Sequence, residues 1–250
     1  MKNKTILYTV CSYLPEDKKI VDNLMPNING MKKWANYVGM DFEIIDQIPN
    51  EVEDVFVKAK QIWNHKKLFH RPRDMHMRKA WITKIESFHR FYKSDYEQVM
   101  FLDCDMMPRA DKGHLINLFD FKSLSNYFYC NLKKSSKKPN HQAVWSGNKE
   151  FARNNIDKKI KERVNAQVFF LTKDFEFNVS DMWSYENLLE LALKDYRFLR
   201  EEVFMSYMLT KTDIIDHVKT LPWRLYIQDI YRNNKQDYIY QNNWENVINE

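Results

Sequence analysis

The chain has 250 residues, of which 39 are Lys or Arg and 34 are Asp or Glu, so its formal net charge is +5 at pH 7. This length is most simply one α/β domain with a full hydrophobic core. Only four glycines are present, which excludes the clustered-glycine loops of Rossmann-type dinucleotide-binding enzymes and of P-loop enzymes.

The three cysteines, Cys11, Cys104 and Cys130, are odd in number and far apart in the sequence. We therefore predict neither a disulfide framework nor a zinc site. No stretch reaches the ~20 apolar residues that would span a bilayer, and the basic start precedes too short an apolar run for a secretory signal. The cytoplasm, of a bacterium or of a virus-infected host cell, fits these features best.

Strand and helix patterns alternate from the start of the chain. Residues 5–13, TILYTVCSY, are rich in β-branched and aromatic residues and predict a strand. Residues 18–38 carry apolar side chains at near-helical spacing, which predicts a helix that Pro26 kinks or splits. Residues 41–46 predict a second strand.

Residues 58–79 form a basic insertion, with eight Lys or Arg and three His against the single acidic residue Asp74. Trp63 and Phe69 are interleaved with these charges. The segment is either a solvated surface or a contact for a polyanion such as a nucleotide diphosphate, a nucleic acid or an anionic glycolipid.

The clearest helix is predicted over residues 78–93, where aromatic and aliphatic side chains recur at steps of three and four. It precedes residues 98–102, whose four consecutive apolar side chains are typical of a central parallel strand buried on both faces. Further strands and helices are predicted, in chain order, over residues 127–132, 166–171, 182–196 and 201–210. The alternation predicts one α/β domain over residues 1–250, with a mostly parallel central sheet flanked by helices and a mobile excursion near residues 133–164.

Two aspartates, Asp103 and Asp105, directly follow the buried strand. In an open α/β sheet ligands bind beyond the carboxyl ends of the strands, and residues two apart in an extended chain point the same way. Two adjacent carboxylates repel each other unless a cation neutralises them, and hard oxygen ligands suit Mg²⁺ or Mn²⁺. We therefore predict a metal site; the alternative is that Asp103 caps a turn and Asp105 faces solvent.

The segment ITKIESFHRFYKSDYEQVMFLDCDMMP, residues 82–108, resembles the helix–strand–D-x-D core of nucleotide-sugar glycosyltransferases with the A-type fold. It is most similar to the retaining galactosyl/glucosyltransferase group, and the order of motifs extends the resemblance over residues 5–225. The resemblance implies a hexosyl- or pentosyltransferase that uses Mn²⁺ or Mg²⁺. Such an enzyme moves a sugar from a nucleotide-diphosphate donor, here UDP-linked, to an acceptor hydroxyl.

The same resemblance implies site residues. Metal ligands would be Asp103 and Asp105, with His217 as a third candidate that is otherwise a structural histidine. Catalytic residues near the sugar would be Glu201 and Glu202, which are otherwise an acidic helix start. Residues near the donor would be Thr9, Ser12, Tyr13, Lys84, Cys104, Asn165, Ala166 and Gln167, with Gln167 standing where the family has glycine.

The basic insertion makes DNA with a hydroxylated base, as in a virus, the leading specific acceptor. Phosphate contacts would come from Lys66, Lys67, Arg71 and Arg73, and base stacking from Trp63 and Phe69. A glycan or glycolipid hydroxyl is the alternative acceptor. Two other classes stay open: a phosphatase or nucleotidyltransferase that uses the same D-x-D, and a non-catalytic nucleic-acid-binding protein.

Overall fold

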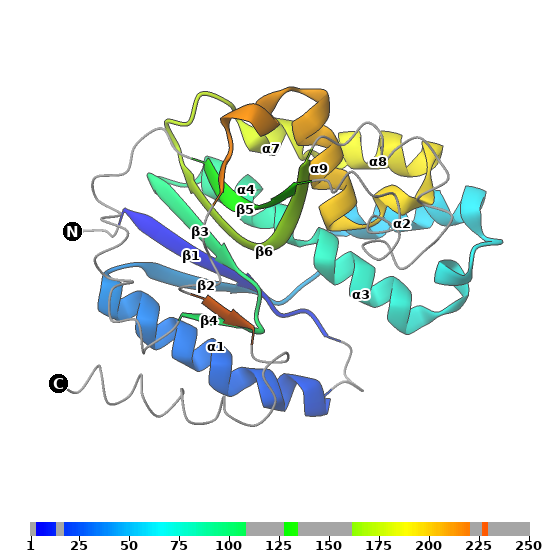
Figure 1. Ribbon diagram of the computed structural model, residues 1–250. Helices are drawn as coiled ribbons and strands as arrows, with labels where there is room; N and C mark the ends of the chain where they lie inside the picture. The colour runs from blue at the N-terminus through cyan, green and yellow to red at the C-terminus, as the bar shows by residue number, and fades with distance from the viewer. Residues whose placement is uncertain (1–3, 14–17, 109–127, 135–161, 221–226, 230–250) are drawn as a thin grey trace.

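The computed structural model describes residues 4–13, 18–108, 128–134, 162–220 and 227–229 (Figure 1). Its centre is a six-stranded sheet in the order β2-β1-β3-β6-β5-β7. These strands are β1 (Thr5–Val10), β2 (Asp41–Ile45), β3 (Gln98–Leu102), β5 (Phe128–Lys134), β6 (Glu162–Thr172) and β7 (Lys219–Thr220). A separate antiparallel pair joins β4 (Met106–Pro108) to β8 (Ile227–Asp229).

Helices precede, link and follow these strands. The α-helices are α1 (Lys18–Val38), α2 (Asn50–Trp63), α3 (Pro72–Ile82), α4 (Lys84–Lys93), α7 (Val179–Met182), α8 (Tyr185–Lys194) and α9 (Glu201–Lys211). Short 3₁₀ helices are η2 (Lys67–His70), η6 (Tyr196–Phe198) and η7 (Ile214–His217). No helix within these described ranges is long and apolar enough to cross a membrane.

The predicted α/β domain with a mostly parallel sheet is confirmed, with one reversed strand. β1 pairs in parallel with both β2 and β3, and β7 pairs in parallel with β5. β6 runs antiparallel to both of its neighbours, β3 and β5. Five of the six strands therefore point the same way, and β6 alone is reversed.

The strand before the two aspartates is buried on both faces, as its apolar run predicts. Val99 and Phe101 join the core cluster formed with α2, α4, α8 and α9, whereas Met100 and Leu102 join the cluster formed with α1. Figure 1 shows the same division, with α1 on one side of the sheet and the other helices opposite. Residues 103–105 therefore follow a strand that the core holds from both sides.

Pro26 does not split α1, which is one continuous helix. The excursion expected near residues 133–164 lies for the most part outside the described part of the chain, since β5 ends at Lys134 and β6 begins at Glu162.

The helix predicted over residues 78–93 is divided at Thr83. α3 ends at Ile82 and α4 begins at Lys84, while the Thr83 hydroxyl donates a hydrogen bond to the Lys79 carbonyl at 2.9 Å. Back-bonding of a Thr hydroxyl to the carbonyl four residues earlier bends helices. Lys84 consequently lies at the N-terminal end of a separate helix.

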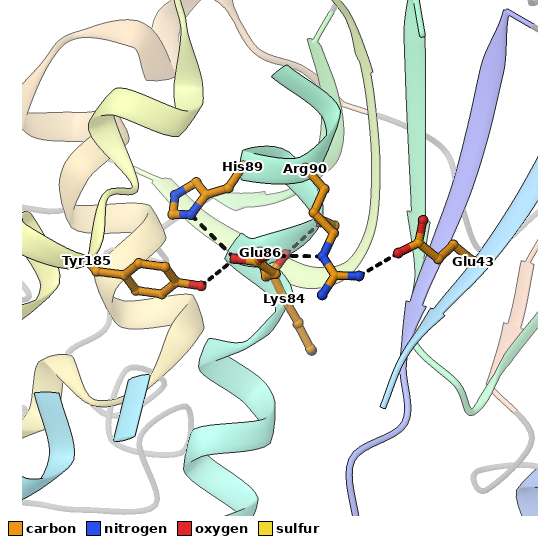
Figure 2. A network of polar contacts seen from close by, with 7 residues as sticks. Glu43, Lys84, Glu86, His89, Arg90 and Tyr185 are labelled. Carbon is orange, nitrogen blue, oxygen red and sulfur yellow. Dashed lines mark hydrogen bonds and ion pairs between the residues drawn. The ribbon is translucent and has the colours of Figure 1, made fainter. Parts of the chain in front are cut away.

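A polar network around Glu86 fixes α4 between β2 and α8 (Figure 2). Tyr185 Oη and Arg90 Nε donate hydrogen bonds to the Glu86 carboxylate at 2.8 and 3.1 Å, and His89 Nδ1 lies 3.7 Å from it. Arg90 also donates to Glu43 on β2. Burial would raise the pKa of Glu86, but the hydrogen bonds from His89, Tyr185 and Arg90 outweigh it and lower the pKa to about 2.

We predict that Glu86→Gln lowers the free energy of unfolding at pH 7 by about 1–2 kcal/mol, after allowance for solvent screening. Because the folded-state pKa of Glu86 is depressed, its contribution is present above its ordinary pKa of 4.5 and is lost as the pH falls toward 2. Urea unfolding at pH 7 and near pH 2 measures the difference. Glu190→Gln, which removes an exposed pair with Lys194, is the matched control and should have little effect. A pH-independent loss in Glu86→Gln would contradict this account.

Candidate active site

A pocket opens at the carboxyl ends of β1 and β3, the neighbouring parallel strands at the centre of the sheet. Its lining residues come from β1 and the segment after it, from α3 and α4, and from the turn after β3: Val10, Ser12, Tyr13, Met77, Ala80, Trp81, Lys84, Asp103, Cys104 and Asp105. The topology therefore brings together six of the residues that the sequence indicated, namely Ser12, Tyr13, Lys84, Asp103, Cys104 and Asp105.

A buried ammonium group links three segments of this site. Lys84 Nζ lies 2.7 Å from Asp103 Oδ1 and 3.5 Å from Glu201 Oε1, and it donates a hydrogen bond to the Ala166 carbonyl at 3.1 Å. Lys84 is only 5% exposed. Burial alone would lower the pKa of Lys84, but Asp103 and Glu201 raise it above its ordinary value. The lysine is therefore a cation in the floor of the site.

The carboxyl group of Asp103 is less easily ionised than an ordinary aspartate. Burial raises the pKa of Asp103 to about 7 against the pull of Lys84, and the charges of Asp105 and Glu201 add to the rise. Lys84 thus contacts two carboxyl groups, those of Asp103 and Glu201, and the charge of a third, Asp105, acts on Asp103. The site has an excess of negative charge that a further cation would offset.

The side chains that could bind a divalent metal ion in this site are the carboxylates of Asp103 and Asp105. Within the part of the chain that the structure describes, no group of three or more His, Cys, Asp or Glu side chains is placed to hold a metal ion. Asp103 and Asp105 nevertheless line one pocket. Mg²⁺ is commonly held by one or two carboxylates with substrate phosphates and water as its other ligands. Two hard oxygen donors beside an open pocket fit that mode.

The turn that carries the aspartates is clamped from two sides. Asp103 N–H donates to the Gln167 carbonyl and Met106 N–H to the Asp103 carbonyl, both at 2.9 Å. From α1, the fully buried Asn27 donates through Nδ2 to the carbonyls of Cys104 at 2.6 Å and of Met106 at 2.9 Å. Sequence reasoning missed Asn27, although a polar residue between the apolar positions of α1 was a signal for it.

Residues of β6 and β1 that were expected near the donor take supporting positions. Ala166 is buried and offers its carbonyl to Lys84, and the Gln167 carbonyl accepts from Asp103. Asn165 lies on β6, but the description does not extend to its side chain. Thr9 is fully buried and outside the pocket lining. Direct contact of Thr9 with a donor therefore does not fit the structure.

His217 is not brought to the aspartates. Its Nδ1 lies 2.8 Å from Glu176 Oε1, and its ring packs against Phe177. Both partners follow the end of β6, which pairs with the start of β3, since Gln98 is opposite Thr172. His217 therefore lies toward the end of the strands opposite to the end that Asp103 follows, which does not fit the predicted third metal ligand.

The acidic pair begins α9, as the resemblance implied for its sugar-side residues. Glu201 is 8% exposed and reaches Lys84, whereas Glu202 is half-buried. The two acids are therefore unequal, and Glu201 is the one that belongs to the charge cluster.

The basic insertion is only partly a surface. Phe69 is 5% exposed, and Trp63 Nε1 donates to the Ala192 carbonyl while its ring packs near Tyr196. The predicted stacking of bases on Phe69 is therefore wrong, since its ring is buried in the core, and the Trp63 ring is packed inward.

The basic side chains of this insertion lie outside the pocket lining. Lys67, Arg71 and Arg73 are exposed on η2 and the start of α3, and Arg71 pairs with Asp74 at 3.5 Å. Lys66 lies over the Tyr196 ring, 5.4 Å from its centroid. These four residues therefore do not form part of the pocket wall.

Sequence reasoning did not predict that α3 forms one wall of the pocket. Met77, Ala80 and Trp81 line the pocket from this helix. His76 Nε2 lies 3.2 Å from the Ser12 carbonyl and so joins α3 to the segment after β1. The signal was present in the predicted apolar face of this helix, which was read as core alone.

No protein-family model matches the chain, and no curated protein matches it. Three crystal structures with a similar fold were found, each described by identity, by coverage of this chain and of the other, and by TM-score. A glycosyltransferase involved in glycosylation of the major capsid of PBCV-1 is 9% identical over 88% of this chain and 82% of its own, with a TM-score of 0.44. Mouse xyloside xylosyltransferase 1 is 9% identical over 96% of this chain and 92% of its own, with a TM-score of 0.43. The mannosyltransferase Ktr4p from S. cerevisiae is 11% identical over 91% of this chain and 70% of its own, with a TM-score of 0.46. TM-scores below 0.5 say nothing of activity, which has to be inferred from this chain's own residues.

We predict that Asn27→Ala lowers the free energy of unfolding by about 1–3 kcal/mol, because it leaves two buried carbonyls without their donor. Denaturant unfolding measures the change. Asn36→Ala, at an exposed position of the same helix, is the control and should change stability by less than about 0.5 kcal/mol. Equal effects of the two substitutions would show that the clamp on the turn contributes nothing.

Proposed function

We propose that this chain is a metal-dependent glycosyltransferase that moves a sugar from a nucleotide-diphosphate donor, UDP-linked, to an acceptor hydroxyl. The observation that carries the proposal is the Lys84 ammonium group between Asp103 and Glu201, in a pocket that Asp105 also lines. The pocket lies at the carboxyl ends of parallel strands, where α/β folds bind ligands.

The end of the pocket near β3 suits the diphosphate. When held by Asp103 and Asp105, Mn²⁺ or Mg²⁺ would supply positive charge opposite the leaving nucleotide. Lys84 adds a fixed cation from the buried floor of the same site. Ser12, Tyr13 and Cys104 line the pocket beside them and would contact the nucleoside.

The side of Lys84 that faces α9 suits the sugar. Glu201 is next to Lys84 and therefore within one side chain of the proposed diphosphate position. A carboxylate there would hold donor hydroxyls, stabilise positive charge developing on the sugar or accept a proton from the acceptor. Glu202, on the same turn of α9, is the second candidate for these roles.

The acceptor has two candidates, a hydroxylated base in DNA and a hydroxyl of a glycan or glycolipid. The exposed Lys67, Arg71 and Arg73 support a polyanion. Against DNA, the burial of Phe69 leaves the base without its predicted stacking partner. We therefore propose a glycan or glycolipid hydroxyl first and DNA second.

The two other classes of protein would give different products from the same donor. A phosphatase or nucleotidyltransferase would act on the phosphates and leave the sugar bond intact, and a nucleic-acid-binding protein would turn over no donor. A transferase without acceptor would instead hydrolyse its donor slowly and release free sugar and nucleotide diphosphate. Product analysis of UDP-sugars incubated with Mn²⁺ separates the three classes.

We predict that chelator abolishes this donor hydrolysis and that added Mn²⁺ or Mg²⁺ restores it. Asp103→Asn and Asp105→Asn should each lower turnover by about a hundredfold or more, because metal charge at a leaving group contributes several kcal/mol. Release of UDP is measured with and without glycan and DNA acceptors. Asp54→Asn, at an exposed position of α2, is the control and should behave like the parent. Full activity in excess chelator would refute metal dependence.

We predict that Glu201→Gln lowers kcat by about a hundredfold while donor affinity changes little, because the proposed role of Glu201 is in the transition state. The substitution keeps the side-chain shape beside Lys84. Steady-state kinetics and donor titration of Glu201→Gln, Glu202→Gln and the double variant distinguish the two acids, and Glu202→Gln should lose less. Near-normal turnover in all three would mean that the acids only begin a helix.

A further inference from the structure

Two arginines flank the pocket on the side of α3 and α9. Arg200 directly precedes Glu201 at the start of α9, and its guanidinium carbon lies 6.0 Å from the centroid of the Trp81 ring. Trp81 lines the pocket. Arg78 lies one helical turn before Trp81 on α3, and α3 contacts α9. Arg200 thus lies by a tryptophan of the pocket wall, and Arg78 is close enough to Arg200 for the two charges to interact. These two residues are called the arginine pair.

The positive charges of the arginine pair are not neutralised by an ion pair within the described residues. Arg78 is half-buried, and within the described residues neither guanidinium group makes an ion pair or a hydrogen bond with another side chain. Burial and then the like charge of Arg200 lower the pKa of Arg78, against the weaker opposite pull of Tyr196, Glu201 and Asp74. Buried charges in proteins are normally paired. Two neighbouring guanidinium groups without such a partner among the described residues are available to bind an anion.

The chemistry of the anion follows from the donors. A guanidinium group presents five N–H donors in a planar fork that matches the two oxygens of a carboxylate or a phosphate. Contacts of this kind are charge-assisted and stronger than neutral hydrogen bonds. The pair therefore suits an oxyanion better than a neutral hydroxyl.

The position of the pair indicates which substrate carries the anion. Asp103, Asp105 and Lys84 occupy the end of the pocket assigned above to the donor diphosphate, and Glu201 the place assigned to the sugar. Arg200 directly precedes Glu201 in the chain, and its guanidinium group lies by Trp81 of the pocket wall. An anion held by the pair would therefore lie next to the place assigned to the sugar, where the acceptor must also bind.

We propose that Arg78 and Arg200 bind an acidic group of the acceptor, a carboxylate or a phosphate, and so make the enzyme selective for an acidic acceptor. The inference rests on the proposed function for the meaning of "acceptor", but the oxyanion site itself does not. The pair would hold the acceptor by its charge while its hydroxyl faces the sugar beside Glu201.

Calorimetric binding without donor or metal, at constant ionic strength, tests the site. The probes are methyl glucoside, methyl glucuronide and glucose 6-phosphate, which share a sugar ring and differ in charge. At least about tenfold tighter binding of an acidic probe is expected, and the tighter of the two identifies carboxylate or phosphate as the source. The preference should disappear in Arg78→Gln and in Arg200→Gln. It should be reduced but present in Arg78→Lys and Arg200→Lys, which keep the charge and lose the fork.

Lys32→Gln, at an exposed position of α1, is the control and should keep the full preference. Equal binding of neutral and acidic probes, or a preference that survives in the double Arg78→Gln/Arg200→Gln variant, would overturn the proposal. Unfolding temperatures establish that each variant is folded, and the lysine variants decide the question if a glutamine variant is not. Donor hydrolysis, measured on the same proteins, fails or succeeds independently of this preference and so tests the proposed function separately.

Discussion

A buried ammonium group is the constraint on which the site depends. Lys84 cannot be charged inside the protein without partners, and it has three: the Asp103 carboxylate, the Glu201 carboxylate and the Ala166 carbonyl. These belong to the turn after β3, to α9 and to β6. One side chain therefore fixes the distance between segments that lie up to 117 residues apart in the sequence, from Lys84 to Glu201. Removing any one partner would leave charge in the floor of the pocket.

Lys84 is held in this position by the helix that it begins. Trp81, near the end of α3, and Lys84, at the start of α4, line the same pocket on either side of Thr83. Two residues after Lys84, Glu86 joins the network with Tyr185 and Arg90. This network ties α4 to β2 and α8, so the lysine has little freedom to withdraw.

What could be predicted from the sequence depended on local pattern and on general rules for sheets. The apolar run before Asp103 predicted a strand buried on both faces, and the strand-end rule then placed Asp103 and Asp105 where ligands bind. Ser12 and Tyr13 were placed near the donor by the resemblance of the first strand to that of the glycosyltransferases. The reversal of β6 was not predicted, although the lack of helical periodicity before it left room for an antiparallel return. Asn27 and Arg200 were missed because their roles come from packing between distant segments, which no local pattern records. The prediction that Phe69 is exposed was wrong because the many charged residues around it made the whole segment look like surface, although its ring faces the core.

The charges of the site are arranged along one direction. At the β3 end, Asp103, Asp105 and Glu201 supply three carboxyl groups against the one ammonium group of Lys84, so this end attracts cations. At the α3 and α9 rim, Arg78 and Arg200 would attract anions. Glu201 lies at the junction, since it contacts Lys84 and directly follows Arg200 in the chain. If the cation end takes the metal and the leaving diphosphate, an acidic acceptor would be drawn to the opposite rim and kept away from the carboxylates by their repulsion. The two substrates would then be oriented by opposite fields before their reacting atoms meet beside Glu201.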